Sequence, residues 1–520
     1  MRFVWLFVAF FASAAIVCIA ITPIVRALAL RHGHVDLPDG RRKLHAKPIP
    51  VAGGVAILTS TVIVFVLLFT FSDWVESILR DYNAGRALDS VVTMRPELIG
   101  LMVAAGIIGL VGVLDDYVGL RGRVKFLGQL IAVAAVISSG VIVEHISIFG
   151  LSWDLGSWAI PITAFWLLGA INSLNLIDGL DGMLGTIGCI VCGSFAALAY
   201  WNHEFQAAFI ATALAGSLLG FLFYNFPPAT IYLGDCGSML VGLVVGVLGI
   251  QSSLKGAATV SLAAPVALLV IPIFDTSAAI VRRVLTGRSI FTTDRAHLHH
   301  RLIDSGRSNH RVLLLVGVLC LIASAGALTS QWFKSEVIAL LSMAMIIGLL
   351  VVTRLFGHAE FLLIKERILD FVRGLRRPTS NDVVRQHAVR LQGSAGWDEL
   401  WRQITATAAQ LQLKAVCLDV NAPALMEGYH ARWGRVHTDS EAPYYWRSEF
   451  PLSAEGQILG RLEVVAQRHG PELRELIVRV AQLVQEIESA IAVLTAPASA
   501  PKLPGKSAAP PLGVEPVQSA

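Results

Sequence analysis

Charged residues are scarce in this chain. Only 15% of its 520 residues are charged, whereas 55% are apolar, and the mean hydropathy is +0.66. An ordinary soluble globular protein carries about 25% charged residues, so this composition excludes that class and indicates a polytopic membrane protein. The net charge of +4 is too small to indicate nucleic acid as a partner.

Cysteine is also rare, and its placement excludes a disulfide framework. The six cysteines are scattered, and all but Cys236 and Cys417 fall within apolar runs. Cys189 and Cys192 form a C-x-x-C pair, but no βαβ pattern surrounds it. We therefore interpret this pair as helix packing rather than redox chemistry.

Apolar runs of about 20 residues predict eleven transmembrane helices. The first, at 3–30, lacks a small-residue cleavage site and is longer than the core of a signal peptide, so we expect it to be retained. The other ten are expected at 51–71, 98–114, 126–144, 158–173, 183–201, 206–224, 237–254, 261–281, 312–330 and 336–356.

Lysine and arginine concentrate in alternate loops. They are abundant after the first span and between the ninth and tenth, but absent from the loops at 145–157 and 202–205. Because such residues mark cytoplasmic loops, we expect the N-terminus outside and the C-terminal region in the cytoplasm. The loop at 72–97 runs against this pattern, since it carries three arginines on the outer side.

The chain after the spans is predicted to have three parts. With the transmembrane domain at 1–357, residues 358–380 read as a basic amphipathic helix on the membrane surface. Residues 381–495 predict a cytoplasmic α+β domain that faintly resembles a GAF-type sensor, and 496–520 an Ala/Pro-rich disordered tail. In the α+β domain, helices are expected at 397–411 and 472–491, a strand at 413–420, and a hairpin at 445–452 and 457–465.

Five polar clusters lie at membrane boundaries, and loop parity places all of them on the cytoplasmic side. In one of them, N-S-L-N-L-I-D-G-L-D-G, amides and carboxylates recur at spacings of three and share a helical face. Its polar members are Asn172, Asn175, Asp178 and Asp181. Such groups are costly to desolvate without partners, so they predict a bound polar ligand or cation; a solvated loop is the alternative.

Two further clusters are acidic. Asp115 and Asp116 end an apolar helix ahead of Lys125. Adjacent carboxylates point in different directions, so one could hold a cation or take a proton while the other orients its surroundings; an ion pair with Lys125 is the structural alternative. Asp235 lies in a glycine-lined turn before a helix N-terminus, which fits metal-linked pyrophosphate binding.

The last two clusters are basic. Lys43 and His45 precede a glycine pair, which suits a phosphate-bearing ligand, although positive-inside charge explains the neighbouring arginines. The run D-R-A-H-L-H-H-R-L contains Arg295, His297, His299 and His300. Three imidazoles would also suit zinc, but a zinc site would not explain the acids and amides elsewhere, so we favour a phosphate.

Taken in their order along the chain, the five motifs resemble those of the polyprenyl-phosphate N-acetylhexosamine-1-phosphate transferases, the MraY–WecA superfamily or glycosyltransferase 4. The resemblance covers about residues 1 to 355. It implies an all-α bundle of ten or eleven transmembrane helices in the bacterial inner membrane, with a cytoplasmic active site. It also implies transfer of a sugar 1-phosphate from a UDP-sugar to a polyprenyl phosphate, release of UMP, and a need for Mg²⁺, with Mn²⁺ as an alternative.

The histidine motif separates two branches of this family. MraY-like members use UDP-MurNAc-pentapeptide and carry consecutive histidines there, whereas His297-Leu298-His299-His300 is similar to the His-x-His-His of WecA-like members. The resemblance therefore implies UDP-GlcNAc as donor and undecaprenyl phosphate as acceptor. The MraY reaction, UDP-GalNAc, the glycan that receives the sugar (lipopolysaccharide O-antigen, capsule or wall polymer) and a homodimer stay open.

The resemblance also implies roles for individual residues. It makes Asp235 the Mg²⁺ ligand with Asn172 in the metal environment, Asp115 the proton acceptor, Asp116 its support, and Asp178 and His297 further catalytic residues. Direct in-line attack is favoured over a covalent aspartyl route. The substrate-binding residues implied are Lys43, His45, Lys125, Asn172, Asn175, Asp181, Asn225, Tyr232, Arg295, His299 and His300.

Two other classes of protein fit part of the pattern. A transporter would place its polar site near the membrane midplane, often within inverted repeats, whereas these acids cluster at one face. A membrane sensor built around the C-terminal domain would leave the five polar clusters unexplained.

Overall fold

The computed structural model describes most of the chain and divides it into two compact units, Met1–Phe371 and Val372–Ala520. The described residues are 4–36, 48–71, 96–149, 151–252, 259–260, 262–289, 296–375, 384–392, 396–422, 427–435, 445–454, 457–467 and 473–495. The domain boundaries expected from the sequence stay a prediction. The predicted tail at 496–520 lies outside the described residues.

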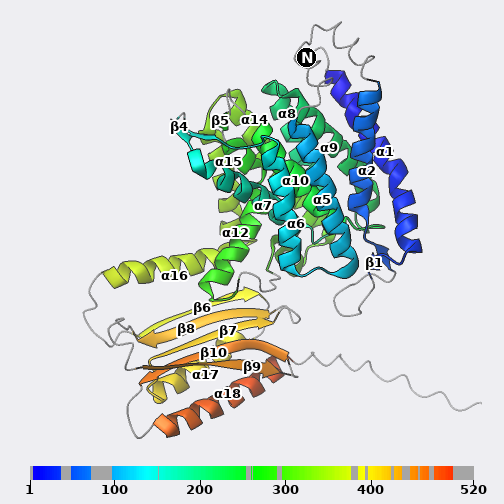
Figure 1. Ribbon diagram of the computed structural model, residues 1–520. Helices are drawn as coiled ribbons and strands as arrows, with labels where there is room; N and C mark the ends of the chain where they lie inside the picture. The colour runs from blue at the N-terminus through cyan, green and yellow to red at the C-terminus, as the bar shows by residue number, and fades with distance from the viewer. Residues whose placement is uncertain are drawn as a thin grey trace, which may run out of the picture. The chain divides into compact units, whose positions relative to one another are not determined.

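Long apolar helices make up the first unit and stand side by side with roughly parallel axes (Figure 1). Within the described residues, eight helices are long and apolar enough to cross a membrane. They are α1 Val4–Arg31, α2 Gly53–Thr70, α5 Pro96–Val118, α7 Ala159–Ile177, α8 Met183–Trp201, α9 Phe205–Asn225, α10 Gly234–Gln251 and α14 Asn309–Trp332. The prediction of a helical membrane protein is confirmed.

Three of the eleven expected spans are shorter or broken. Helices α6, Gly122–Ser138, and α15, Glu336–Val352, have 17 residues each. The segment expected at 261–281 is divided into α11, Ala263–Leu268, and α12, Val270–Leu285. Pro272 explains this break, because it has no N–H for the carbonyl of Leu268 and its ring would clash with that carbonyl. The full count of eleven spans stays a prediction.

Glycines allow α10 to pack closely against its neighbours in the centre of the bundle. A Cβ on Gly242 would lie 2.6 Å from the Cα of Ile171 in α7, and one on Gly112 in α5 would lie 2.3 Å from the Cα of Cys236. Small residues commonly allow such close helix contacts in membranes. Here they bring the first turn of α10 directly beside the last turns of α5.

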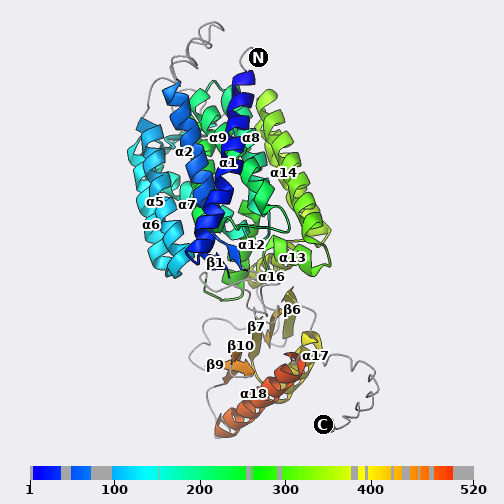
Figure 2. The same ribbon diagram turned by 90° about the vertical axis from the view of Figure 1, so that its right-hand side faces the viewer.

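Short elements gather at the two ends of the bundle. Strand β1, Val35–Asp36, pairs with β2, Ile49–Pro50, and lies with α12 and α13, Leu298–Asp304, at the end opposite the start of α1 (Figure 2). The strands β3 His145–Ile148, β4 Leu151–Asp154 and β5 Thr259–Val260 form a sheet in the order β4-β3-β5. The 3₁₀ turn η1, Gly156–Trp158, leads from β4 into α7.

The predicted amphipathic helix after the spans is α16, His358–Leu375. Its predicted apolar stripe includes Phe361, Ile364 and Ile368, which are exposed. On another side of α16, the buried Glu360 forms an ion pair with the buried Arg282 of α12. A position on the membrane surface stays a prediction.

The second unit contains a five-stranded antiparallel sheet in the order β6-β8-β7-β10-β9. Its strands are β6 Val384–Gln392, β7 Ala415–Ala422, β8 Glu427–Arg435, β9 Tyr445–Ala454 and β10 Gln457–Gln467, and its helices are α17 Trp397–Gln410 and α18 Leu473–Thr495. Trp397, Trp401, Leu418, Tyr429 and Ile487 are buried in one core between helices and sheet. The predicted helices, strand and hairpin are confirmed; β6 and β8 were not predicted, and the GAF likeness stays a prediction.

We expect Gly112→Ala to destabilise the bundle, because its added Cβ would overlap the backbone of α10 at Cys236. Overpacking of this kind costs about 1–3 kcal/mol. The thermal unfolding midpoint in detergent should fall. Gly106→Ala is the matched control in the same helix, since a Cβ there has open space, and its midpoint should be unchanged or higher. Equal midpoints for both variants would contradict the close packing of α5 against α10.

Candidate functional site

A cavity of ≈ 420 Å³ lies among the ends of α5, α7, α9 and α10. Seven residues expected from the sequence line it: Asp116, Asn175, Asp178, Asp181, Asn225, Tyr232 and Asp235. Asp36 and Ser238 also line it and were not predicted. Tertiary packing thus brings together three of the five predicted clusters, although they are far apart in the sequence.

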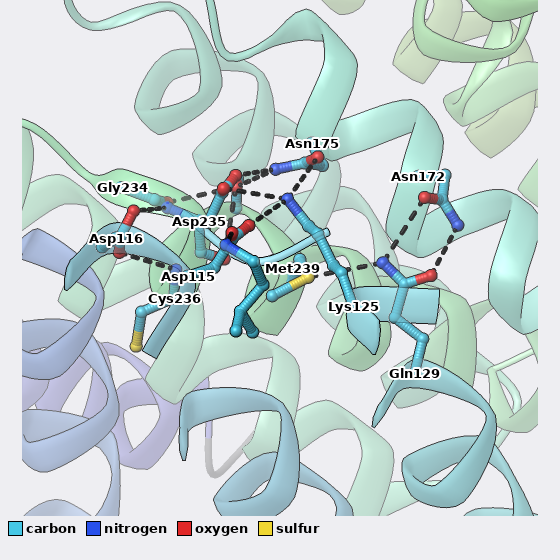
Figure 3. A network of polar contacts seen from close by, with 12 residues as sticks. Asp115, Asp116, Lys125, Gln129, Asn172, Asn175, Gly234, Asp235, Cys236 and Met239 are labelled. Carbon is cyan, nitrogen blue, oxygen red and sulfur yellow. Dashed lines mark hydrogen bonds and ion pairs between the residues drawn. The ribbon is translucent and has the colours of Figure 1, made fainter. Parts of the chain in front are cut away.

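Asp116 fixes the start of α10. Its Oδ1 accepts the N–H of Asp235 at 2.8 Å, and its Oδ2 accepts the N–H of Cys236 at 3.2 Å (Figure 3). These N–H groups belong to the first turn of α10, where they have no partner within the helix and where a negative charge is favoured. The carboxylate of Asp116 therefore sets the position of the Asp235 side chain.

Lys125 lies between two carboxylates. Its Nζ is 2.9 Å from Oδ2 of Asp115 and 2.9 Å from Oδ2 of Asp235 (Figure 3). Asn175 donates to Oδ1 of Asp235 at 2.5 Å and to Oγ of Ser238 at 2.8 Å. The ion pair considered as a structural role for Lys125 is therefore present, and the same ammonium group faces the cavity-lining acid.

Like charges crowd the loop that follows α7. Burial, followed by the nearby carboxylates of Asp235, Asp116 and Asp181, raises the pKa of Asp178 to about 8. The Asp178 carboxyl therefore holds its proton at neutral pH unless a cation approaches. The repulsion among these carboxylates therefore indicates that the cavity binds a cation.

Tyr232 and Asn225 shape another wall of the cavity. Burial, helped by Asp181 and Asp36, raises the pKa of Tyr232 to about 12, so its phenol stays neutral. Asn225 accepts the N–H of Gly182 at 3.0 Å and donates to the carbonyl of Ile231 at 2.9 Å. Asn225 thus ties the loop after α7 to the loop after α9.

The glycine pair that follows the predicted Lys43 and His45 contacts the segment just before α10. The N–H groups of Gly53 and Gly54 donate to the carbonyls of Tyr232 and Leu233 at 2.9 and 2.8 Å. Asp36, which lies before these two basic residues in the chain, lines the cavity. Lys43 and His45 are outside the described residues, as is Arg295.

The histidine segment contacts the loop after α7. A Cβ on Gly179 would lie 2.2 Å from Nε2 of His299, so only glycine allows this approach. Burial, then His300 and His297, lowers the pKa of His299 to about 3, which keeps its ring neutral. Its buried Nδ1 has no hydrogen-bond partner among the described residues, as expected of a group that awaits a ligand.

Asn172 and His297, both predicted as site residues, are not among the residues that line the cavity. The amide of Asn172 donates to Gln129 at 2.9 Å (Figure 3) and to the carbonyl of Leu168 at 2.8 Å. His297 bonds the buried Asp275. Gln129 and Asp275 were not predicted; the signal that could have found them is a lone polar residue within an apolar helix.

The residues present fit Mg²⁺. Among the described residues, no three His, Cys, Asp or Glu side chains are already grouped to enclose a metal ion. Mg²⁺ commonly takes only one or two protein carboxylates and completes its shell with water and substrate phosphates. The Asp235 carboxylate is 32% exposed and keeps lone pairs for a metal beside its contacts to Lys125 and Asn175.

We expect Mg²⁺ to bind more tightly as the pH rises from 6.5 to 8.5. Asp178, with its pKa near 8, loses its proton over this range, and a cation favours the ionised form. The apparent affinity should rise by up to about tenfold per pH unit, measured as Mg²⁺-dependent shifts of the unfolding midpoint. Asp178→Asn should weaken the dependence. A pH-independent affinity in the unmodified protein would contradict this electrostatic account.

Comparison with known proteins agrees with this geometry. Residues 98–253, which carry both Asp115–Asp116 and Asp235, match the profile of Glycosyl transferase family 4. A probable undecaprenyl-phosphate N-acetylglucosaminyl 1-phosphate transferase of Bacillus subtilis is 33% identical over 329 residues, which cover 63% of this chain and 85% of the relative.

Two further relatives represent both branches of the superfamily. A decaprenyl-phosphate N-acetylglucosaminephosphotransferase of Mycolicibacterium smegmatis is 33% identical, covering 66% of this chain and 86% of its own. A phospho-N-acetylmuramoyl-pentapeptide-transferase of Shouchella clausii is 30% identical, covering 59% and 92%. The resemblance seen in the five motifs is therefore confirmed, and the chain belongs to glycosyl transferase family 4.

Proposed function

We propose that this protein transfers N-acetylglucosamine 1-phosphate from UDP-GlcNAc to undecaprenyl phosphate and releases UMP. The observation that carries the proposal is the contact of Lys125 with both Asp115 and Asp235 beside the acidic cavity. This arrangement combines a candidate base, a phosphate-binding cation and a metal ligand within one network. The GlcNAc-1-phosphate transferases among the relatives and the His-x-His-His pattern support this donor.

The donor is proposed to bind with its uracil on Tyr232 and its pyrophosphate near Lys125. A neutral aromatic ring at the cavity wall suits stacking on a base. Asn175 and Asn225 hold the surrounding loops by the hydrogen bonds described above, and Oδ2 of Asp181 accepts the N–H of Ala229 at 3.0 Å. His299 and His300, together with Arg295, Lys43 and His45, are proposed to bind the phosphates.

In the proposed reaction, an oxygen of the lipid phosphate attacks the β-phosphorus of the donor in line. The new P–O bond forms as the bond from the β-phosphorus to the bridging oxygen breaks, and UMP leaves with that electron pair. Asp115 accepts the proton of a monoprotonated lipid phosphate. His297 is proposed to stabilise charge on the phosphates, and Asp178 to act in the environment of the metal.

Asp235 would hold Mg²⁺, or Mn²⁺ in its place, and Asp116 keeps Asp235 in position. When bound, the metal would neutralise negative charge on the pyrophosphate and on the departing UMP. The amide oxygen of Asn172, the atom that would contact a metal, accepts from Nε2 of Gln129 at 3.4 Å, so Asn172 is proposed to act through the packing of α7 against α6. Positioning and charge stabilisation then supply most of the catalysis.

The site is proposed to face the cytoplasm of a bacterial inner membrane, because arginines mark the helix ends here: Arg31 in the last turn of α1, and Arg282 and Arg283 in the last turn of α12. The lipid-linked sugar would begin a cell-envelope glycan. A donor of the pentapeptide type is the alternative within the family, supported by the relative from Shouchella clausii.

We expect Asp115→Asn and Asp235→Asn to lower UMP release by about 10²–10⁴-fold, since each removes a charge from the reacting centre. The assay uses purified protein with UDP-GlcNAc, undecaprenyl phosphate and Mg²⁺, with UDP-GalNAc and UDP-MurNAc-pentapeptide as rival donors. Asp154→Asn serves as the control, because Asp154 is an exposed acid of β4 that does not line the cavity. A folded wild-type protein that is silent with every donor would refute the proposed function.

Substitutions of Tyr232 test the uracil contact. Tyr232→Phe keeps the ring and should change KM for UDP-GlcNAc by less than about threefold. Tyr232→Leu removes the stacking surface, which is worth roughly 1–3 kcal/mol per base, and should raise KM by about 5–100-fold. If both variants keep the wild-type KM, the base binds elsewhere.

A further inference from the structure

We propose that Asp275 is a positioning residue that orients the histidine segment of the site; this inference rests on the proposed function. Asp275 lies in α12, and its side chain is 1% exposed. Its Oδ2 is 2.9 Å from Nδ1 of His297, and its Oδ1 accepts the N–H of Leu298 at 2.7 Å. Both carboxylate oxygens are therefore engaged by consecutive residues of one segment.

A buried carboxylate is costly without partners, so this pair of contacts is specific rather than incidental. Holding Nδ1 of His297 as a donor sets the orientation of its ring and leaves Nε2 for another partner. Two turns further along α12, Arg282 donates to the carbonyl of Ala296 at 3.2 Å. Ala296, His297 and Leu298 are thus all tied to the same helix.

The contacts continue from His297 to the cavity. The rings of His297 and His299 are nearly parallel, with centroids 6.2 Å apart and an angle of 6°, and the ring of His300 lies 4.2 Å from that of His299. His299 contacts Gly179, which lines the cavity. Asp275 is absent from that lining, so any effect it has on the reaction passes through the histidines.

Asparagine cannot replace Asp275 in this role. If its amide oxygen accepts the N–H of Leu298, its NH₂ group faces Nδ1 of His297 and can only donate to it, which moves the ring proton to Nε2. In the reverse orientation the N–H of Leu298 loses its partner. Either arrangement changes the tautomer of His297 or shifts the histidine segment. Residues that orient a ligating or catalytic histidine from behind typically change activity by about 10–100-fold.

The kinetic test compares wild type, Asp275→Asn, His297→Gln and the double variant in lipid nanodiscs with UDP-GlcNAc, undecaprenyl phosphate and Mg²⁺. We expect Asp275→Asn to lower kcat by about 10–100-fold, and the double variant to be no slower than His297→Gln alone, because one residue acts through the other. Multiplying effects, or an Asp275→Asn protein as fast as wild type, would overturn the proposal.

The matched control is Asp419→Asn, which removes one partner of another buried pair, Asp419 with His430 at 3.3 Å in the second unit. Its turnover should equal that of wild type. A similar loss in this control would show that any buried Asp–His pair matters through stability, and would also overturn the specific role of Asp275.

A spectroscopic readout makes the inference independent of turnover. In protein labelled with ¹⁵N-histidine, the Nδ1–H of His297 should give a downfield proton signal, assigned by its loss in His297→Gln and displaced in Asp275→Asn. Absence of this signal from wild type overturns the proposal, even where the Asp275→Asn protein does not fold. Wild type with the signal but without turnover refutes the proposed function instead.

Discussion

The two hydrogen bonds from the first turn of α10 to the Asp116 carboxylate are the interaction on which the rest of the site depends. They join the end of α5 to the start of α10 and hold Asp235 at the cavity. Hydrogen bonds to a charged group contribute roughly 1.5–3 kcal/mol each. They are possible only because Gly112 lets the two backbones approach, so a packing constraint and an electrostatic one meet at the same turn.

The site is short of positive charge. Asp115, Asp116, Asp178 and Asp235 lie around one described cation, Lys125, which already contacts two of them. A pyrophosphate would be repelled by this group of acids without further cations. A divalent metal and the basic side chains of the first and last polar loops would supply that charge. This imbalance gives a physical reason for the presence of both acidic and basic motifs in this chain.

The second unit has its own core and stands apart from the family match. The matched profile ends at residue 253, and the relatives cover up to 66% of this chain. Along the chain, α16 leads from the first unit toward the second. Its Glu360 is paired with Arg282 of α12, the helix that also carries Asp275. The helix that leads to the second unit and the histidine segment therefore share one support, α12.

The sequence by itself determined the class of protein, the family and most of the cavity-lining residues, because hydropathy, helical spacing and ordered motifs are local properties of the chain. It also predicted the hairpin of β9 and β10, whose strands are close in sequence. Strands β6 and β8 were missed because charged residues and histidines interrupt their apolar pattern, and their strand state depends on pairing with each other. The break between α11 and α12 depended on the position of Pro272.

Only the tertiary structure decided what each polar residue contacts. It paired Asn172 with Gln129 rather than with the cavity, turned Asp115 toward Lys125 and Asp116 toward α10, and brought Asp275 to His297. These contacts join residues from 10 to 119 positions apart. Spacing along one helix cannot specify them, because they depend on how closely glycines allow separate helices to approach and on where buried charges find partners.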